Sequence, residues 1–209
     1  SSTLSTASYG MATMSNHGVA GYYCGGIGGT RVSTVVDKIT YSNDTIALST
    51  SLLYGNYYIA SFSNNKVAGY VTNVSSSFIN KNNFTADTMS AIALSNTIQQ
   101  YYPACFANSG VAGYQLGGGS TPVAAIVKWS FTADTGYVIS SSLTTARSYA
   151  CGVSHNQVAG YVGGGQNSTP AYISSIEKIS FNSDTVSSIS ATLSSAKYQM
   201  SGLSNGGIA

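Results

Sequence analysis

Charged side chains are scarce in this sequence. Lys, Arg, Asp and Glu make up 7% of the 209 residues, against about 25% in an average soluble domain. The eight bases and six acids leave a formal net charge of +2, and they form no basic cluster that could follow a phosphate backbone. We therefore expect that the protein does not bind nucleic acid.

Long apolar runs are lacking as well. No stretch approaches the ~18 consecutive apolar residues of a membrane-spanning helix, and residues 1–10 contain neither the basic nor the apolar part of a secretion signal. We expect a soluble chain that carries no targeting segment and does not insert into a membrane. With 43% hydrophobic and 11% aromatic residues, the chain can still fill one sizeable core.

Cysteine, which builds disulfide frameworks and many zinc sites, occurs only three times. Cys24, Cys105 and Cys151 are an odd number, and no Cys-x-x-Cys or Cys/His ligand spacing is present. Cys105 and Cys151 hold the same position in two successive repeats, where a Cα separation of ~5.5 Å, typical of a disulfide, is not expected. We predict small buried thiols, no metal site and no cofactor.

The sequence is dominated by a repeat. The tetrapeptide Val-Ala-Gly-Tyr begins at residues 19, 67, 111 and 158, in steps of 48, 44 and 47 residues. A second anchor, Lys-x-x-aromatic-x-x-Asp-Thr, follows each one and contains the pairs Lys38 and Asp44, Lys81 and Asp87, Lys128 and Asp134, and Lys178 and Asp184. Glycine clusters separate the two anchors in the first, third and fourth copies. A constant period of this kind indicates a repeat architecture.

These anchors divide the chain into repeats at about residues 4–51, 52–96, 97–142 and 143–192, with a partial repeat at 193–209. We predict one propeller-like array over residues 1–209. Because the first half of the repeat occurs five times and the second half four times, two arrangements remain. Either the terminal strands close a small ring, or the chain is a section of a longer propeller. The second arrangement is favoured because the sequence stops within a fifth copy of the Val-Ala-Gly-Tyr motif.

Each repeat is predicted to form four short strands. In the fourth copy these are residues 148–154, 158–163, 173–181 and 186–190, with polar turns between them. Large apolar residues alternate with polar ones at Val127, Trp129 and Phe131, as on a strand. The predicted fold is all-β: a β-propeller of four-stranded antiparallel blades, with about 4.5 blades present and a β-solenoid as the alternative.

Within each predicted sheet, Val-Ala-Gly-Tyr should form an inner strand, and the Lys-to-Asp-Thr segment should form the next strand and its turn. The glycines of the tetrapeptide suit a crowded place where neighbouring strands converge. The glycine clusters are interpreted as turns that need positive φ or close packing, since no phosphate-binding Gly-x-x-x-x-Gly-Lys-Ser/Thr motif is present.

The order of these motifs resembles a known family. Leu-Ser-x-Ala-Arg, Ser-Asn-x-x-Val-Ala-Gly-Tyr, Gly-Gly-Gly and Ile-x-Lys-Ile-x-Phe-x-x-Asp-Thr together resemble the kelch-like repeats of tailed-bacteriophage virion proteins, especially cyanophage-type tail-fibre and appendage proteins. The resemblance covers essentially the whole chain, and residues 37–45 are a typical form of the repeat. The later Trp of eukaryotic kelch blades is missing, because Trp129 is the only Trp. The resemblance implies an extracellular part of a phage particle.

The acidic residues do not suggest catalysis. Four of the six acids are the repeated aspartates, which we expect to stabilise turns by accepting backbone N–H groups, with the lysine approaching the same turn or a neighbouring sheet. A cation site at each aspartate is the alternative. The other two, Asp37 and Glu177, lie in different repeats, whereas glycosidases need two carboxylates roughly 5–10 Å apart. His17 and His155 lack a nucleophile motif. We predict that the protein is not an enzyme.

Binding is the positive hypothesis. Sixteen tyrosines with many Asn and Ser residues are typical of glycan-binding and antibody surfaces. The repeated tyrosines Tyr22, Tyr70, Tyr114 and Tyr161 are expected to pack between sheets. Variable turns supply the candidate ligand-binding residues, which are Asn16, His17, Asn64, Asn65, Asn108, Ser109, His155 and Asn156.

The predicted function is therefore a non-enzymatic tail-fibre or appendage module of a virion that recognises or adheres to a host-surface glycan. The alternative is a purely structural virion scaffold or decoration protein. The expected partners are a host cell-surface glycan or other virion proteins, and a homo-oligomer is compatible with both functions.

Overall fold

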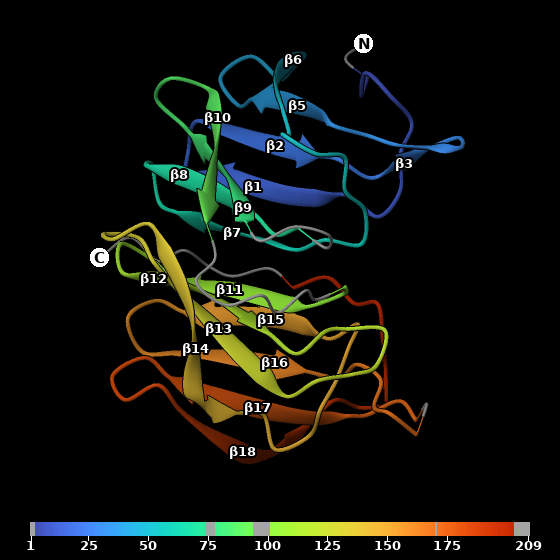
Figure 1. Ribbon diagram of the computed structural model, residues 1–209, viewed down its shortest axis with the longest axis vertical. Coiled ribbons are helices and arrows are strands. Elements are labelled where there is room, and N and C mark those ends of the chain that lie inside the picture. The colour runs from blue at the N-terminus through green and yellow to red at the C-terminus, as the bar shows by residue number, and fades with distance from the viewer. Residues whose placement is uncertain (1–2, 74–77, 94–100, 170, 203–209) are drawn as a thin grey trace. The chain divides into compact units, whose positions relative to one another are not determined.

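The computed structural model describes residues 3–73, 78–93, 101–169 and 171–202, and it divides the chain into two compact units, residues 1–97 and 98–209. Each unit is described by itself. All regular structure in the described ranges is β-strand (Figure 1). Among these residues there is no helix long and apolar enough to cross a membrane.

Unit 1 contains two four-stranded sheets and a small hairpin. Sheet I has the strand order β1-β2-β5-β6, sheet II has the order β10-β9-β8-β7, and β3 pairs with β4. The strands are β1 (Ala12–Asn16), β2 (Ala20–Cys24), β3 (Ile27–Gly28), β4 (Arg31–Val32), β5 (Val35–Thr40), β6 (Thr45–Ser51), β7 (Ser61–Asn64), β8 (Ala68–Val71), β9 (Phe78–Asn83) and β10 (Thr88–Ala93).

Unit 2 contains two sheets of the same kind. Sheet III has the strand order β11-β12-β13-β14, and sheet IV has the order β15-β16-β17-β18. The strands are β11 (Ala104–Asn108), β12 (Ala112–Leu116), β13 (Ala125–Ser130), β14 (Thr135–Ser142), β15 (Cys151–His155), β16 (Ala159–Gly163), β17 (Ser175–Ser180) and β18 (Thr185–Thr192).

Each repeat that the sequence predicts contains one of these sheets. The described pairings within the four sheets are antiparallel between strands consecutive in the sheet order, unlike the parallel rungs of a β-solenoid. As predicted, Val-Ala-Gly-Tyr supplies an inner strand, because β2, β8, β12 and β16 each lie between two other strands of their sheet. The lysine lies in the next strand and the aspartate in the turn after it. The all-β prediction is thus confirmed.

The strand boundaries in the fourth repeat differ slightly from the prediction. The first strand begins at Cys151 rather than at residue 148, because Tyr149 has a φ of 57°, which is incompatible with an extended strand. The third strand is shorter at both ends, Ser175–Ser180, and the fourth is longer, Thr185–Thr192.

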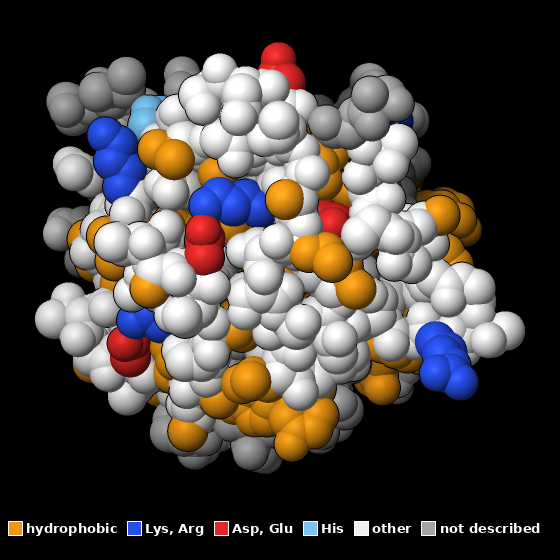
Figure 2. Space-filling model, turned by 90° about the horizontal axis from the view of Figure 1, so that it is seen from above, with side chains coloured by type: hydrophobic (Ala, Val, Ile, Leu, Met, Phe, Trp, Pro, Cys, Tyr) orange, Lys and Arg blue, Asp and Glu red, His pale blue; other side chains and the backbone are white. Residues whose placement is uncertain are grey.

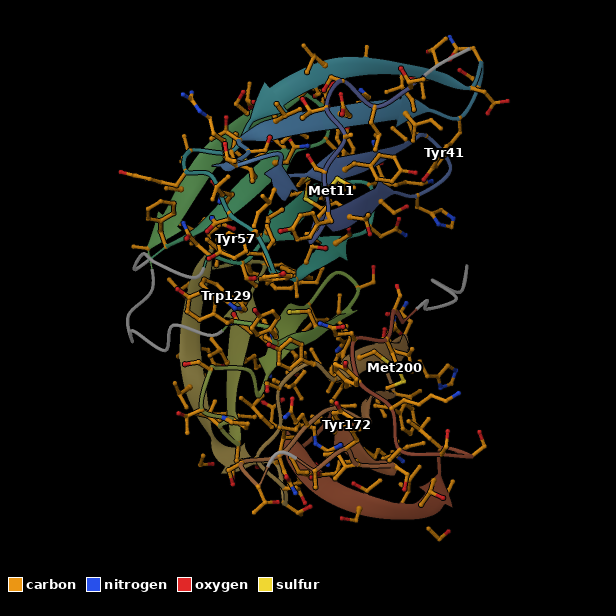
Figure 3. All side chains as sticks on the ribbon, turned by 90° about the vertical axis from the view of Figure 1, so that its right-hand side faces the viewer. Met11, Tyr41, Tyr57, Trp129, Tyr172 and Met200 are labelled. Carbon is orange, nitrogen blue, oxygen red and sulfur yellow. The ribbon has the colours of Figure 1, made fainter. Side chains whose placement is uncertain are left out.

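The alternation predicted around Trp129 is present, but both faces of that strand are covered. Trp129 and Val127 are buried on one face, and Ile126 on the opposite face is fully buried as well. The ring of Trp129 (labelled in Figure 3) lies against Gly136, its cross-strand partner on β14. Ile126 is covered because sheets III and IV pack face to face.

The core of unit 2 is drawn from both of its sheets. Phe106 and Tyr114 of sheet III pack against Phe181 of sheet IV, with the Tyr114 and Phe181 rings stacked at 5.2 Å. The full cluster is Ala104, Phe106, Ala112, Tyr114, Leu116, Ile126, Leu143, Ala150, Val162, Ile179 and Phe181. In unit 1 the same contact joins Tyr22 of sheet I to Phe84 of sheet II, with ring centroids 5.3 Å apart.

Candidate functional site

In each unit the repeated lysine and tyrosine of one sheet bind the repeated aspartate of the next. In unit 1, Lys38 Nζ lies 2.5 Å from Asp87 Oδ2, and the Tyr22 hydroxyl donates to Asp87 Oδ1 at 2.7 Å. In unit 2, Lys128 Nζ lies 2.6 Å from Asp184 Oδ2, and the Tyr114 hydroxyl donates to Asp184 Oδ1 at 2.7 Å. We call this three-residue arrangement the inter-sheet clamp.

Local structure positions every part of the clamp. Tyr22 and Lys38 are cross-strand partners, and the Lys38 ammonium lies 5.7 Å from the centre of the Tyr22 ring, within cation–π range. Asp87 has a φ of 50°, a left-handed conformation at the turn. Burial, followed by the hydrogen bond to Asp87, raises the pKa of Tyr22, so the phenol stays protonated and donates.

The expected turn hydrogen bonds are made by a different residue. In the described turns, Asp87 and Asp184 accept from Tyr and Lys of the neighbouring sheet. Asparagine accepts the Asx-type bonds instead. In the first copy it is Asn43, the residue before Asp44, and Thr45 N donates to Asn43 Oδ1. In the second copy Thr85 N donates to Asn83 Oδ1. The aspartate carboxylate is thereby left to join two sheets.

The glycine clusters receive the segment that leads into the next sheet. Gly118 N donates to Arg147 O at 2.7 Å, and Gly26 N donates to Asn56 O at the same distance. These glycines have φ values of 93° and 90°. Both expected features, positive φ and close backbone approach, are therefore present at these two positions.

Sequence reasoning missed a buried ion pair in sheet IV. Arg147 Nη2 lies 2.5 Å from Glu177 Oε1, and both side chains are almost completely buried. Glu177 also accepts the backbone N–H groups of Thr144 and Thr145. Arg147 donates further to Gly164 O at 3.0 Å. Burial lowers the pKa of Arg147, and Glu177 opposes that shift.

In sheets I and II as well, the residue before the repeated lysine accepts hydrogen bonds from a segment that precedes the first strand of its sheet. In sheet I, Asp37 accepts from the N–H and the hydroxyl of Ser5 at 3.1 and 3.0 Å. In sheet II, Asn80 accepts from the N–H of Leu53 at 3.0 Å. The only signal in the sequence is a polar residue beside each lysine of these sheets, and its partner lies some 30 residues away.

The predicted ligand-binding residues lie at the turn after the first strand of each sheet. Asn16, Asn64 and Asn108 are buried there, whereas His17, Ser109 and Asn156 are half-buried and Asn65 and His155 are exposed. The structure brings three of them together in unit 2. Asn108 Oδ1 accepts Gln157 N at 3.1 Å, and Asn156 Oδ1 accepts Ser109 N at 3.0 Å. These two amides therefore join neighbouring turns.

A group of tyrosines lies near the residues that precede the first strands of the sheets in unit 2. In unit 2, Tyr102 stacks on Tyr149 with ring centroids 3.8 Å apart, and Tyr149 contacts Tyr198 edge-on at 6.1 Å. Tyr198 stacks on Tyr172 at 4.4 Å with an interplanar angle of 6°. We call these four residues the tyrosine ladder. Tyr172 and Tyr198 are 49% and 40% exposed, so their rings are open to a ligand.

The backbone of the ladder is held in an unusual conformation. Tyr102 and Tyr149 have φ values of 56° and 57°, and Gln199 at the same repeat position has 53°. Tyr149 N donates to Tyr102 O, and Gln199 N donates to Tyr149 O, both at 3.0 Å. Such conformations cost a bulky residue of order 1–3 kcal/mol and are concentrated at functional sites.

Unit 1 contains a shorter version of the same feature. Tyr58 has a φ of 54° and its N–H donates to Gly10 O at 3.0 Å. Its ring lies 6.2 Å from that of Tyr9 and 5.0 Å from that of Tyr57. The sequence signal was a tyrosine recurring nine residues before Val-Ala-Gly-Tyr, at Tyr58, Tyr102 and Tyr149.

The titratable groups do not gather into a metal site. Among the described residues, no three His, Cys, Asp or Glu side chains lie close enough to share an ion. Burial, and then the charge of Asp37, raises the pKa of the Cys24 thiol to about 12. Burial also raises the pKa of Cys105 and of Cys151. The three thiols are therefore protonated at neutral pH, and none is paired in a disulfide.

The surface that these units expose is poor in charge. Figure 2 shows a face on which uncharged polar groups predominate, while acidic and basic side chains are few and scattered. No protein-family model matches the sequence, and no curated protein matches it significantly.

Proposed function

We propose that this chain is a non-enzymatic recognition module of a phage virion appendage and that its tyrosine ladder binds a host-surface glycan. The ladder is the observation that carries the proposal, because it combines exposed stacked rings with a backbone held in a costly conformation. The four sheets are, in this proposal, kelch-like blades of a β-propeller. An extracellular position on the virion and the resemblance to tail-fibre and appendage repeats belong to the same proposal.

The geometry within each unit supports the blade assignment. Each repeat forms one antiparallel four-stranded sheet, as blades do. The first strands of neighbouring sheets lie together, since a Cβ on Gly152 of β15 would lie 2.6 Å from Cys105 O of β11. At the predicted crowded position, Gly160 gives room to the ring of Phe106 from the preceding sheet.

The chemistry of the ladder suits an uncharged sugar. The C–H face of a pyranose stacks on a flat aromatic ring, and the phenolic hydroxyl can hydrogen-bond to the sugar. Tyr172 and Tyr198 offer both, and the neighbouring Tyr198 raises the pKa of Tyr172. The scarcity of charge favours a neutral ligand over an anionic one.

A glycan microarray probed with the purified chain, followed by calorimetry on the strongest ligand, tests the proposal. Tyr198→Ala should weaken binding by about tenfold, and Tyr198→Phe should weaken it less because the ring is kept. Tyr137→Ala is the matched control, since Tyr137 is 42% exposed on β14 outside the ladder. Absence of glycan binding, or equal losses at Tyr198 and Tyr137, would contradict the proposal.

A structural scaffold is the second candidate, and the clamps and turn-to-turn amides favour it. These contacts use the most regular polar residues of the repeat to join sheets rather than to face solvent. A scaffold function predicts that the purified chain binds no glycan and that Tyr198→Ala changes assembly with other virion proteins. Co-sedimentation with assembled particles, with and without the substitution, measures this.

A further inference from the structure

One exposed ring of the tyrosine ladder, that of Tyr172, lies on a short ribbon of three backbone segments. In unit 2, Ser148 pairs with Gln166, and Gln166 pairs with Tyr172, both antiparallel. Ser148 N donates to Gln166 O at 3.0 Å, and Gln166 N donates to Ser148 O at 2.8 Å. Because directly paired residues of antiparallel segments point to the same face, the three side chains share one face of this ribbon.

Unit 1 contains the same ribbon, with its exposed tyrosine on another segment. Tyr9 pairs with Ile27, and Ile27 pairs with Val32 of β4. Tyr9 N donates to Ile27 O at 3.1 Å, and Ile27 N donates to Tyr9 O at 2.9 Å. Tyr9 and Ser148 both lie ten residues before their Val-Ala-Gly-Tyr. The segments of the two ribbons therefore correspond, and Tyr9 lies on the face equivalent to that of Tyr172.

This face of unit 1 presents aromatic and apolar groups to solvent. Tyr9 is 57% exposed, and Val32 beside it is 43% exposed. The Tyr9 ring lies 6.2 Å from the Tyr58 ring at an interplanar angle of 58°. The Tyr57 ring (labelled in Figure 3) lies 5.0 Å from the Tyr58 ring. We call Tyr9, Tyr57 and Tyr58 the unit 1 tyrosine cluster.

The backbone fixes this cluster in place. Tyr9 uses both its N–H and its carbonyl group in the ribbon, and Gly10, the next residue, accepts from Tyr58 N at 3.0 Å. Tyr58 has a φ of 54°, close to the 57° of Tyr149 in the ladder. Its ring packs on Gly10, where a Cβ would lie 3.1 Å from Tyr58 Cδ1. Rings that are fixed before binding lose little conformational entropy when a ligand stacks on them.

We propose that the unit 1 tyrosine cluster is a second binding site for the neutral pyranose that the tyrosine ladder binds. The inference rests on the proposed function, because it takes the class of ligand from the ladder. Tyr9 offers a flat ring to the C–H face of a sugar and a hydroxyl for a hydrogen bond, as Tyr172 does. Two sites for one sugar gain affinity together only on a ligand that displays the sugar repeatedly. The host-surface glycan is therefore a polysaccharide with a repeated neutral unit.

An NMR titration of the chain with isotope-labelled tyrosine rings tests the second site. The probes are the methyl glycosides of glucose, galactose, mannose, N-acetylglucosamine and N-acetylgalactosamine, which are neutral pyranoses. One and the same glycoside should shift the ring signals of the unit 1 tyrosine cluster and those of the tyrosine ladder, because both offer the same stacking surface.

Tyr9→Ala separates the two sites. It should weaken glycoside binding in unit 1 by about tenfold, the effect of one lost ring contact, and leave the shifts of the ladder signals unchanged. Tyr9→Phe keeps the ring and should weaken binding less. Tyr54→Ala is the matched control, because Tyr54 is 58% exposed in unit 1 and its ring contacts Phe78. The control should leave both sites unchanged, and each variant should keep the melting temperature because the substituted rings are mostly exposed.

Binding to a surface coated densely with the active glycoside tests the repeating ligand. Tyr9→Ala should bind this surface at least about tenfold more weakly than the unsubstituted chain, since the gain from two linked sites is lost. Equal binding of the two proteins would overturn the assignment of a repeating ligand.

The titration distinguishes a failure of the second site from a failure of the proposed function. A glycoside that shifts the ladder signals but not those of Tyr57 and Tyr58 would overturn the second site and leave the proposed function standing. Equal losses from Tyr9→Ala and Tyr54→Ala would overturn the second site as well. If no glycoside shifts the ladder signals, the proposed function fails, and this inference fails with it.

Discussion

Units 1 and 2 are built from the same pair of sheets, but they bury polar groups differently. Beside the repeated lysine, unit 2 places Glu177 in an ion pair with Arg147 and in bonds to two backbone N–H groups. Unit 1 places Asp37 there, and among the described residues its hydrogen-bond partner is Ser5. The clamps, by contrast, have nearly the same distances in both units.

The difference extends to the satisfaction of buried atoms. Within the described part of unit 1, buried atoms without a hydrogen-bond partner include Asp37 Oδ1, Asn80 Nδ2 and both amide atoms of Asn82. In the described part of unit 2 only Trp129 Nε1 belongs to this group. Each such atom costs about 1–3 kcal/mol. The clamp between sheets is therefore nearly the same in both units, whereas the hydrogen bonding of buried polar side chains differs. Fewer buried polar side-chain atoms lack a partner in the described part of unit 2 than in that of unit 1.

The largest expected effect comes from breaking the Arg147–Glu177 pair. Glu177→Ala should lower the free energy of unfolding by about 3–5 kcal/mol, because it leaves a buried guanidinium without its counter-ion. Denaturant unfolding of the purified chain measures this. Asp37→Ala in unit 1 should cost less, since Asp37 holds a single residue.

A double variant separates the charge from the packing. Arg147→Met with Glu177→Leu should recover part of the lost stability, because apolar groups of similar size often replace a buried ion pair at little cost. The recovery is incomplete because the N–H groups of Thr144 and Thr145 still lose their acceptor. Equal losses for Glu177→Ala and Asp37→Ala would remove the distinction between the units at this position.

An intermediate effect is expected where side chains of one sheet enter the glycine of the next. Gly160→Ala in unit 2 should cost about 1–3 kcal/mol because the new methyl group would meet the rigid ring of Phe106. Gly69→Ala in unit 1 should cost less, since Met14 is flexible and can move aside. Thermal unfolding of the two variants compares them, and a reversed order would show that side-chain flexibility does not decide the cost.

The smallest expected effect concerns the thiols. Cys24 in unit 1 is fully buried, whereas Cys151 in unit 2 is half-buried, so Cys151 should react faster with an alkylating reagent at pH 8. Because folding raises the pKa of Cys24 to about 12, from ~8.5 when unfolded, its buried thiol favours folding below pH ~8.5. That contribution should decline as the pH rises toward 12.

Comparing the pH dependence of unfolding with that of Cys24→Ala isolates this contribution. The variant should lose less stability between pH 8.5 and 12 than the unsubstituted chain does. Identical curves would mean that the thiol is not held protonated in the folded state.

Much of the architecture was predictable because the same strand and turn motifs recur in four copies of the repeat. Alternating apolar residues and constant spacing predicted one four-stranded sheet per repeat, and the tetrapeptide glycines predicted crowding where neighbouring strands meet. The tyrosine ladder was not predicted, although its tyrosines recur. Their left-handed backbone has no signature in residue type, since Tyr, Gly and Gln share the position.

The sequence alone determined that a lysine, a tyrosine and an aspartate recur at fixed places on each sheet, because strand periodicity and turn chemistry are local properties. Only the tertiary structure decided which of them meet. Lys38 binds Asp87, which lies 49 residues away, and not Asp44, which lies six residues away in its own turn. The lysine side chain extends from its sheet toward the neighbouring sheet. Its partner therefore depends on how the two sheets pack, which spacing along the chain does not determine.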